Sequence, residues 1–371
     1  MKRSLLATTA CGIFAASAHA QSSVALYGLI DAGVTYTSNQ GGKSGVSATS
    51  GTLSGSRFGL TGSEALGGGW KAIFTLETGF DVMNGKLGQN GRGFGRQAFV
   101  GLSSDRFGTF TLGRQYDSVV DTLGAMEMSA LAHPYDNDNL QNSFRIDNSV
   151  KYQSVNYGGL TFSGLYGFSN SASSFANNRA YSFGASYRYG GLNVGASYMQ
   201  LGRAGSSTNT SGAVSDDATF TADAQRTWGI GANYAFGQAV VGAIFTQTHL
   251  DNLTGISASA SGTSNGLSLS GSSARFNNYE LQARYHVSPA LSLTAAYTYT
   301  DGKVAGASPK WNQFGLTADY ALSKRTDVYL RGVYQRVHGT GDSGITASIA
   351  GLTASDSNHQ TAVTLGLRHS F

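Results

Sequence analysis

The stretch that indicates the fold is Val24-Ala25-Leu26-Tyr27-Gly28-Leu29-Ile30-Asp31-Ala32-Gly33-Val34, near the start of the chain. Most of its apolar side chains share one face, whereas Tyr27 and Asp31 share the other. Successive side chains of a β-strand point to opposite faces, so this period of two predicts a strand with one apolar and one polar face. Such a strand suits a transmembrane β-barrel, in which one face meets lipid and the other meets water.

The same alternation recurs along the chain, in runs close to the ~9–11 residues that a tilted membrane-spanning strand needs. About 16 such runs predict an all-β fold, a transmembrane antiparallel up-and-down β-barrel. The runs are Val24–Val34, Ser56–Ser63, Trp70–Phe80, Arg96–Ser103, Thr109–Tyr116, Asn148–Val155, Leu160–Phe168, Arg179–Arg188, Leu192–Gln200, Gln225–Ala235, Ala239–His249, Arg275–His286, Leu291–Thr300, Lys310–Tyr320, Arg325–Arg336 and His359–Phe371.

The connectors between these runs fall into two length classes that alternate along the chain. The short ones are tight turns such as Glu64–Gly69, whereas the long ones are mostly rich in Ser, Gly, Thr and Asn. Short turns on one side and long loops on the other are the layout of outer-membrane barrels, and a soluble β-sandwich gives no reason for it. The long connectors include Ser38–Gly55, Asp117–Arg145, Leu201–Ala224, Leu250–Ala274 and Val337–Asn358.

The chain opens with three signs of an exported protein. Met1-Lys2-Arg3 is positively charged, Leu5–Ala18 is apolar, and Ala18-His19-Ala20 offers small residues around a cleavage site. This order is that of a secretory signal peptide. We therefore expect a signal peptide over 1–20 and an outer-membrane barrel over 21–371.

Composition supports a barrel exposed to lipid. The chain has 51 Gly, 19 Tyr and 19 Phe but only 12% charged residues, against ~25% in soluble domains. Its net charge of +4 includes Lys2 and Arg3 of the predicted signal peptide, so a nucleic-acid partner is not indicated. Cys11, the only cysteine, also lies there, which excludes disulfide and thiol chemistry from the mature chain.

The Asp117–Arg145 connector differs from the rest because its alternation stops. Its apolar residues fall at roughly helical spacing, and a long connector with local structure is usually functional or disordered. An isolated loop of this kind would more often lie on the outside, but the predicted barrel around it favours a loop folded inward that narrows the hole. Its candidate acidic residues are Asp117, Asp121, Glu127, Asp136 and Asp138.

The chain ends in Gly366-Leu367-Arg368-His369-Ser370-Phe371, and the terminal Phe371 resembles the signal that the barrel assembly machinery recognises. Four further motifs lie earlier in the chain, at Ser23–Gly33, Ser56–Leu60, Arg96–Leu102 and Leu112–Tyr116. Together these motifs resemble the trimeric general porins of β-proteobacteria.

This resemblance covers the whole mature chain and carries expectations of its own. It implies a 16-stranded barrel in the outer membrane, a homotrimer, contact with lipopolysaccharide, and a third external loop bent into each lumen. Asp117–Arg145 is the third long connector. The Pro-Glu-Phe-Gly motif of enteric porins is absent from it, so their side-chain positions in this loop cannot be transferred.

A porin needs a charged constriction rather than reaction chemistry. Arg57, Arg96 and Arg114 match family positions near the pore wall, and Arg145 and Lys151 flank the exit of the acidic loop. A cation facing mid-bilayer lipid costs ~2–4 kcal/mol, which favours the lumen for strand arginines. The alternative for each is contact with lipid headgroups at a strand end. We expect a weak anion preference because the arginines lie on the rigid wall.

Two details of the strand pattern need a structural answer. Arg96 shares the parity of apolar Val100, and Arg114 that of Leu112, so a β-bulge or a position at the strand end is required. The three tryptophans lie near predicted strand ends, where a membrane-interface girdle places aromatic rings. They are Trp70, Trp228 and Trp311.

No motif indicates an enzyme, a metal site or a cofactor. The histidines lack an i, i+4 pair, and Gly67-Gly68-Gly69 lies in a turn rather than before a helix. The second hypothesis is an adhesin or receptor that binds through Leu201–Ala224 and Leu250–Ala274, although their composition is typical of solvated surface. The sequence thus predicts an outer-membrane porin for ions and small hydrophilic solutes, and the resemblance implies that it is a trimer.

Overall fold

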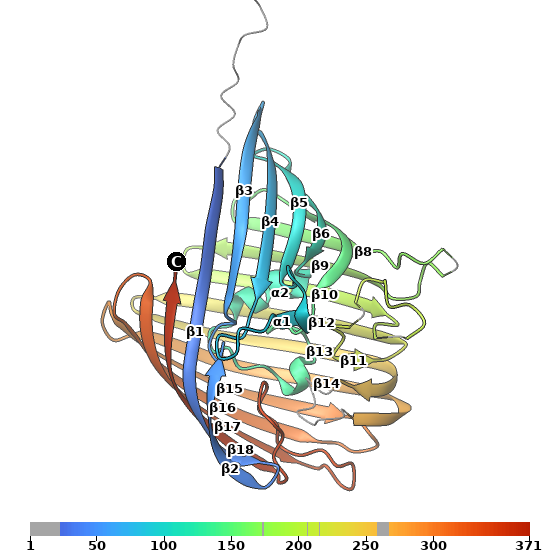
Figure 1. The fold of residues 1–371 in the computed structure, drawn as a ribbon, viewed down its shortest axis with the longest axis vertical. Helices are drawn as coiled ribbons and strands as arrows, with labels where there is room; N and C mark the ends of the chain where they lie inside the picture. Colours follow the sequence, from blue (N-terminus) through green and yellow to red (C-terminus); the bar gives the residue numbers. More distant parts are fainter. Residues whose placement is uncertain (1–22, 173, 206, 215, 258–266) are drawn as a thin grey trace, which may run out of the picture.

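The chain folds as one antiparallel sheet whose strands follow each other in sequence order (Figure 1). The predicted signal peptide lies outside the residues that the computed structural model describes. These described residues are 23–172, 174–205, 207–214, 216–257 and 267–371.

Strands make up most of the described chain. They are β1 (Ser23–Gln40), β2 (Lys43–Ser50), β3 (Arg57–Gly67), β4 (Trp70–Gly79), β5 (Gln97–Ser104), β6 (Gly108–Gln115), β7 (Ile146–Gln153), β8 (Leu160–Gly167), β9 (Arg179–Tyr189), β10 (Leu192–Gly202), β11 (Phe220–Thr221), β12 (Ala224–Phe236), β13 (Ala239–Ile256), β14 (Leu267–His286), β15 (Leu291–Lys303), β16 (Lys310–Ala321), β17 (Thr326–His338) and β18 (His359–Ser370). The helical segments are α1 (Gly88–Gly91), α2 (Ser118–Thr122), η1 (Gly124–Met126) and η2 (Pro134–Asp136). Within the described residues, none of these helices is long and apolar enough to cross a membrane.

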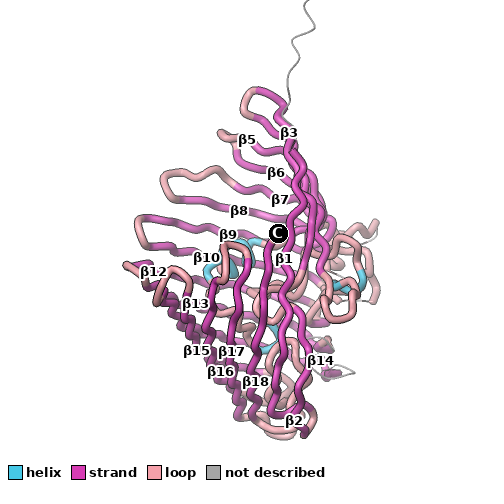
Figure 2. The backbone as a smooth tube through the Cα atoms, turned by 60° about the vertical axis from the view of Figure 1, so that its left-hand side comes forward, coloured by secondary structure: helices cyan, strands magenta, loops and turns pink. Residues whose placement is uncertain are grey.

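The sheet closes on itself. β2 and β3 both pair with β1, and β11 and β12 both pair with β13, so each of these pairs makes one interrupted barrel strand. The result is a closed 16-strand antiparallel barrel, which confirms the predicted fold class and strand number. At the seam, Leu29 of β1 lies opposite Ser370 of β18, and Figure 2 shows the carboxyl end beside β1.

The two faces of the barrel wall have opposite polarity. On β14, Leu281 is 63% exposed, whereas its neighbours Glu280 and Gln282 are 2% and 4% exposed. An apolar exposed face and a polar buried face reverse the arrangement of soluble proteins. This is the pattern of a wall that meets lipid outside and polar groups inside.

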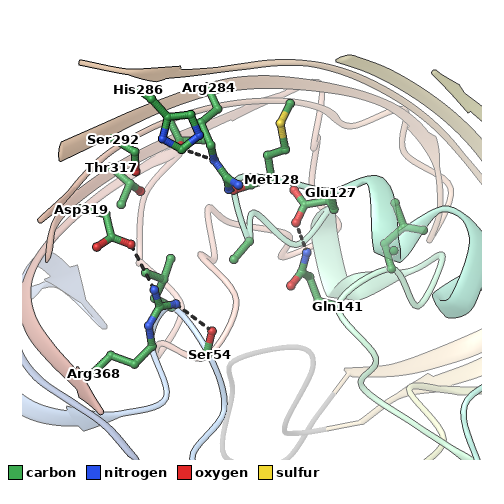
Figure 3. Close-up of a pocket in the computed structure, with 15 residues that line it drawn as sticks. Ser54, Glu127, Met128, Gln141, Arg284, His286, Ser292, Thr317, Asp319 and Arg368 are labelled. Carbon is green, nitrogen blue, oxygen red and sulfur yellow. Dashed lines mark hydrogen bonds and ion pairs between the residues drawn. The ribbon is translucent and has the colours of Figure 1, made fainter. Parts of the chain in front are cut away.

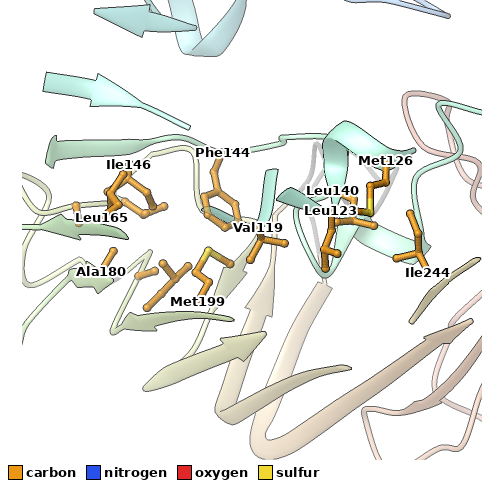
Figure 4. Packing of buried hydrophobic residues seen from close by; sticks show 14 residues of the cluster. Val119, Leu123, Met126, Leu140, Phe144, Ile146, Leu165, Ala180, Met199 and Ile244 are labelled. Atoms are coloured by element: carbon orange, nitrogen blue, oxygen red, sulfur yellow. The ribbon is translucent and has the colours of Figure 1, made fainter. Parts of the chain in front are cut away.

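The largest apolar cluster lies between the 117–145 loop, the connector that spans Asp117–Arg145, and the buried face of the wall. In Figure 4, Val119 and Leu123 of this loop lie close to side chains of the neighbouring strands. Loop and strands therefore share one core. The labelled members are Val119, Leu123, Met126, Leu140, Phe144, Ile146, Leu165, Ala180, Met199 and Ile244.

Two predicted loops are largely strand. Ser38–Gly55 contains β2, which pairs with β1 around a hairpin tip at Gly41 and Gly42. Both glycines have positive φ, as the tight turns that match strand twist require. Leu250–Ala274 contains the ends of β13 and β14. Their Ser- and Gly-rich sequence lacks the alternation of a buried face, but the backbone ladder needs no particular side chain.

The exceptions to alternation have local causes. Arg96 precedes β5, and the β6–β7 register shifts between Gly113 and Gln115, so Arg114 lies at an irregularity. Both of the solutions that the sequence left open therefore occur. The girdle prediction is wrong for Trp311, which is 2% exposed because Tyr135 of the 117–145 loop and Phe276 pack against it.

Candidate functional site

The 117–145 loop begins with a capped helical turn. The carboxylate of Asp117 accepts backbone hydrogen bonds from Val119 (2.7 Å) and Val120 (3.2 Å) at the start of α2, which satisfies amide groups that a helix end leaves unpaired. Val119 and Leu123 are fully buried. The helical spacing seen in the sequence is thus realised, although only as a short turn.

Hydrogen bonds fasten this loop to the buried face of many strands. Gln282 of β14 accepts from the Met128 amide at 2.6 Å and donates to the Met126 carbonyl at 2.9 Å. Similar side-chain bonds come from β12, β13, β16 and β17, so loop carbonyls replace water as partners of buried wall groups. They run from Gln225 and Thr248 to Asn137, from Gln313 to Ala132, and from Arg331 to Ala130.

A buried charge network anchors the loop's far end. His133 Nδ1 lies 2.7 Å from Asp138 Oδ2, and His133 Nε2 lies 3.4 Å from Glu280 Oε2. Burial alone would lower the pKa of His133, but Asp138 and Glu280 raise it well above its usual value. Burial likewise would raise the pKa of Asp138, but the His133 charge and the hydrogen bonds lower it. The result is a buried imidazolium between two carboxylates.

The other acidic residues of the loop are mostly occupied by local bonds. Asp136 accepts from the backbone amides of Gln141 and Ser143, both at 3.0 Å. Burial raises the pKa of Asp117 and of Asp136 to about 6 in each case. Asp121 pairs with Lys151. Of the five predicted acids, Glu127 is the one that lines a cavity found among the described residues.

Two predicted wall arginines meet at one carboxylate. Arg96 Nε lies 2.8 Å from Glu77 Oε1, and Arg57 Nε lies 3.8 Å from Glu77 Oε2. Tyr116 accepts from Arg96 at 2.9 Å, and Tyr27 donates to Glu77 at 3.0 Å. The structure thus brings Arg57 and Arg96 together and partly neutralises them. Glu77 and Tyr27 were not selected from the sequence, although both fall on the predicted polar face.

Arg114 lies in a different cluster. It pairs with Asp147 at 2.6 Å and with Asp217, and Arg92 pairs with Asp217 at 2.6 Å and with Asp216. The side chains of Arg114 and Asp217 are 8% and 4% exposed. This predicted wall cation is therefore engaged by a carboxylate from the connector between β10 and β11.

The remaining two predicted cations also have partners. The Arg145 guanidinium lies 5.7 Å from the Tyr116 ring centroid, and burial, with Arg96 nearby, lowers the pKa of Arg145 to about 10. Lys151 donates to the Tyr116 carbonyl at 3.0 Å in addition to its pairing with Asp121. Lys151 thereby ties β7 to the start of the 117–145 loop.

A second arginine group was missed by sequence reasoning. Arg284, Arg331 and Arg368 come from β14, β17 and β18, and the first and last line a cavity of about 380 Å³ (Figure 3). Glu127 and Gln141 of the 117–145 loop close its other side (Figure 3). Their parity on polar faces was the available signal, but the family motifs drew attention to the first strands instead. Among the described residues, no group of three His, Cys, Asp or Glu could hold a metal ion.

Comparison with known families decides what this barrel is. A family model described as "Gram-negative porin" matches residues 7–342. The chain belongs to this porin family. A porin of the outer membrane from Bordetella pertussis is 32% identical, and one from Delftia acidovorans is 29% identical, each matching over 100% of both chains. The structure of an anion-selective porin from Comamonas acidovorans is 25% identical, with a TM-score of 0.73 over 94% of this chain and 100% of that one.

These likenesses confirm the predicted family, function and location. The porin is a channel of the Gram-negative outer membrane, and its relatives are channels rather than enzymes. The adhesin or receptor alternative is not supported. Part of Leu201–Ala224 is buried rather than solvated, since Ala213 and Val214 are at most 1% exposed and pack with Ile146.

Proposed function

We propose that the porin passes ions and small hydrophilic solutes down their gradients, with a weak preference for anions, and that the 117–145 loop crosses the lumen as its constriction. The observation that carries this proposal is the set of hydrogen bonds that side chains on the buried face of β12, β14, β16 and β17 donate to loop carbonyls. A loop fastened to the polar face of a closed barrel narrows the water-filled space inside it.

The proposed anion preference rests on which charges are left unopposed. Arg57 and Arg96 share the single carboxylate of Glu77. Four of the five loop acids are paired with Lys151 or His133, or accept backbone hydrogen bonds. The fifth, Glu127, accepts side-chain hydrogen bonds from Ser129 and Gln141. The wall therefore offers more available positive than negative charge, which favours anions in a low-dielectric passage. The anion-selective character of the Comamonas relative supports the same sign.

The proposed assembly is a homotrimer in contact with outer-membrane lipid and lipopolysaccharide, inserted by the barrel assembly machinery. The exposed apolar face, with Leu281 63% and Leu365 64% exposed, needs lipid or another subunit to cover it. Chemical cross-linking of the purified protein should give a three-subunit product. A product limited to one or two subunits would contradict the trimer.

The sign of the selectivity is tested by the zero-current potential of the purified porin in a planar bilayer under a KCl gradient. For an anion-preferring pore, the potential has the sign that chloride diffusion sets. Its size is smaller than the chloride limit because some potassium also passes. A potential of the opposite sign would refute the anion preference. A folded barrel without conductance would refute an open channel altogether.

A further inference from the structure

The cavity of about 380 Å³ has two unlike sides. The barrel wall supplies Arg284 and Arg368 together with the hydroxyls of Ser292 and Thr317, whereas the 117–145 loop supplies the amide of Gln141. In Figure 3 these polar groups surround one open space, and the dashed interactions leave most of it unfilled. A concave site with few, convergent polar groups is the usual form of a small-molecule subsite.

Arg368 does not supply free charge to this cavity. Its guanidinium donates to Asp327 (3.1 Å), to Asp319 (3.1 Å) and to Ser54 (3.2 Å). The hydrogen-bond donors of Arg368 are thus occupied by two carboxylates and a hydroxyl. Asp319, which also lines the cavity, is likewise directed at Arg368.

Arg284 is different because its hydrogen-bond partners are neutral. It donates to the Met128 carbonyl at 2.7 Å and to Thr294 Oγ1 at 3.1 Å. Among the described residues, no carboxylate oxygen lies within 4.0 Å of its guanidinium nitrogens. The carboxyls of Asp319 and Glu127 act on this guanidinium only from beyond ion-pair distance, so it can still form a charged hydrogen bond with a ligand.

Glu127 does not cancel this charge at neutral pH. Its carboxyl accepts from Ser129 at 2.6 Å and from Gln141. Burial, together with the nearby Glu280, raises the pKa of Glu127 to about 8, so the group is mostly protonated at pH 7. The lining then carries Arg368 paired with Asp319, a mostly protonated Glu127, and Arg284 as a cation without an ion pair of its own among the described residues.

We infer that this cavity is a binding subsite for small hydroxylated monocarboxylates, with Arg284 holding the carboxylate. A single cation without an ion pair matches a single negative charge, whereas a second carboxylate on the ligand would approach Asp319. Ser292, Thr317 and Gln141 offer hydrogen bonds to a ligand hydroxyl. This inference rests on the proposed passage of small anions and names a chemical class that the channel would retain.

The test titrates glycolate at fixed KCl concentration while the conductance of the porin in a planar bilayer is recorded. Binding in the cavity predicts a saturable fall in conductance for the unaltered protein. Loss of a charged hydrogen bond changes affinity roughly tenfold. Arg284→Gln should therefore raise the half-effect concentration, the glycolate concentration that gives half of the maximal fall in conductance, roughly tenfold. Arg325→Gln makes the same charge change at an exposed turn outside the cavity and should leave it unchanged.

Two further measurements keep the inference falsifiable if Arg284→Gln disturbs folding. Thr317→Val removes one lining hydroxyl and should raise the half-effect concentration severalfold. Glycine, which has the size of glycolate but no net charge, should not cause a saturable fall in conductance. The subsite would be refuted if glycolate lowered the conductance of both variants with an unchanged half-effect concentration, or if glycine lowered it as glycolate does. It would also be refuted if glycolate caused no saturable fall in the unaltered protein.

These outcomes are separate from those of the proposed function. An anion-preferring zero-current potential without glycolate saturation removes the subsite and leaves the anion-preferring channel. A cation-preferring potential removes the proposed selectivity, and it does so whatever the glycolate titration shows.

Discussion

Arg96 and Glu77 form an ion pair of the predicted pore wall, with Arg96 Nε 2.8 Å from Glu77 Oε1. Glu77 is 4% exposed and also lies 3.8 Å from Arg57. One carboxylate thus restrains two cations. The strength of the positive field at this wall depends on Glu77 as much as on the arginines.

Glu77→Gln should therefore increase anion preference. The substitution keeps the shape of the side chain but frees Arg57 and Arg96 from their shared negative charge. The zero-current potential under a KCl gradient should shift toward the chloride limit. Glu64→Gln changes the same charge at an exposed position near the end of β3 and serves as the control. Equal shifts in both variants would show that Glu77 lies away from the ion path.

Neutral replacements of the wall arginines should not be equivalent. Arg57→Gln and Arg96→Gln should move selectivity toward cations, because both arginines share one counter-charge. Arg114→Gln should instead reduce stability, since it removes one of the two cations that pair with the buried Asp217, at a cost of roughly 1–3 kcal/mol. Reversal potentials and the midpoints of urea unfolding separate the two effects. A large selectivity change in Arg114→Gln with unchanged stability would instead place Arg114 at the narrowest part of the channel.

The ionisation of Glu127 should make the channel sensitive to pH. The pKa of Glu127 is raised to about 8, so its carboxylate forms as the pH rises through that value, beside Arg284 and opposite Asp319 and Arg368. Anion preference should then fall, and Glu127→Gln should remove this fall. Because the folded pKa lies above the ordinary value, the stability contribution of the protonated group is also lost as pH rises toward 8. Zero-current potentials on both sides of pH 8 provide the measurement.

His133→Ala should loosen the far end of the 117–145 loop. It would leave Asp138 and Glu280 buried without their cation, and breaking such a pair costs roughly 3–5 kcal/mol. Faster hydrogen exchange of the loop amides and a noisier open-channel current are expected, while the barrel stays folded. His338→Ala, at an exposed position, is the matched control. Unchanged loop exchange would mean that the network does not anchor the loop.

Removal of Phe371 should harm assembly more than the finished channel. Its backbone exchanges two 3.0 Å hydrogen bonds with Gly28 at the barrel seam, and its ring covers Gly28 closely enough that a Cβ there would lie 2.3 Å from it. The amount in the outer membrane of cells should fall severalfold, whereas protein refolded in detergent should still conduct. Equal losses in both settings would assign Phe371 a structural role only.

The barrel could be predicted from sequence because a period of two fixes which face each side chain meets, and Val24–Val34 already shows it. The charge partners could not. Arg114 meets Asp217 about a hundred residues later only because a loop folds back over the wall. Trp311 has the sequence environment of a girdle residue, yet Tyr135 covers it. Strand parity says which face a residue occupies, but not which loop closes over it.

The claim that the 117–145 loop narrows the channel is tested most directly by Gln141→Cys. Loss of the signal peptide would leave this as the only cysteine, and Gln141 lines the cavity on the loop side. If the channel is constricted at this point, a negatively charged thiol reagent should lower the conductance and reduce anion preference. A positively charged reagent should lower the conductance and increase anion preference. The control Lys86→Cys, at an exposed position in another loop, should respond to neither reagent. Full modification of Gln141→Cys without any change in current would contradict it.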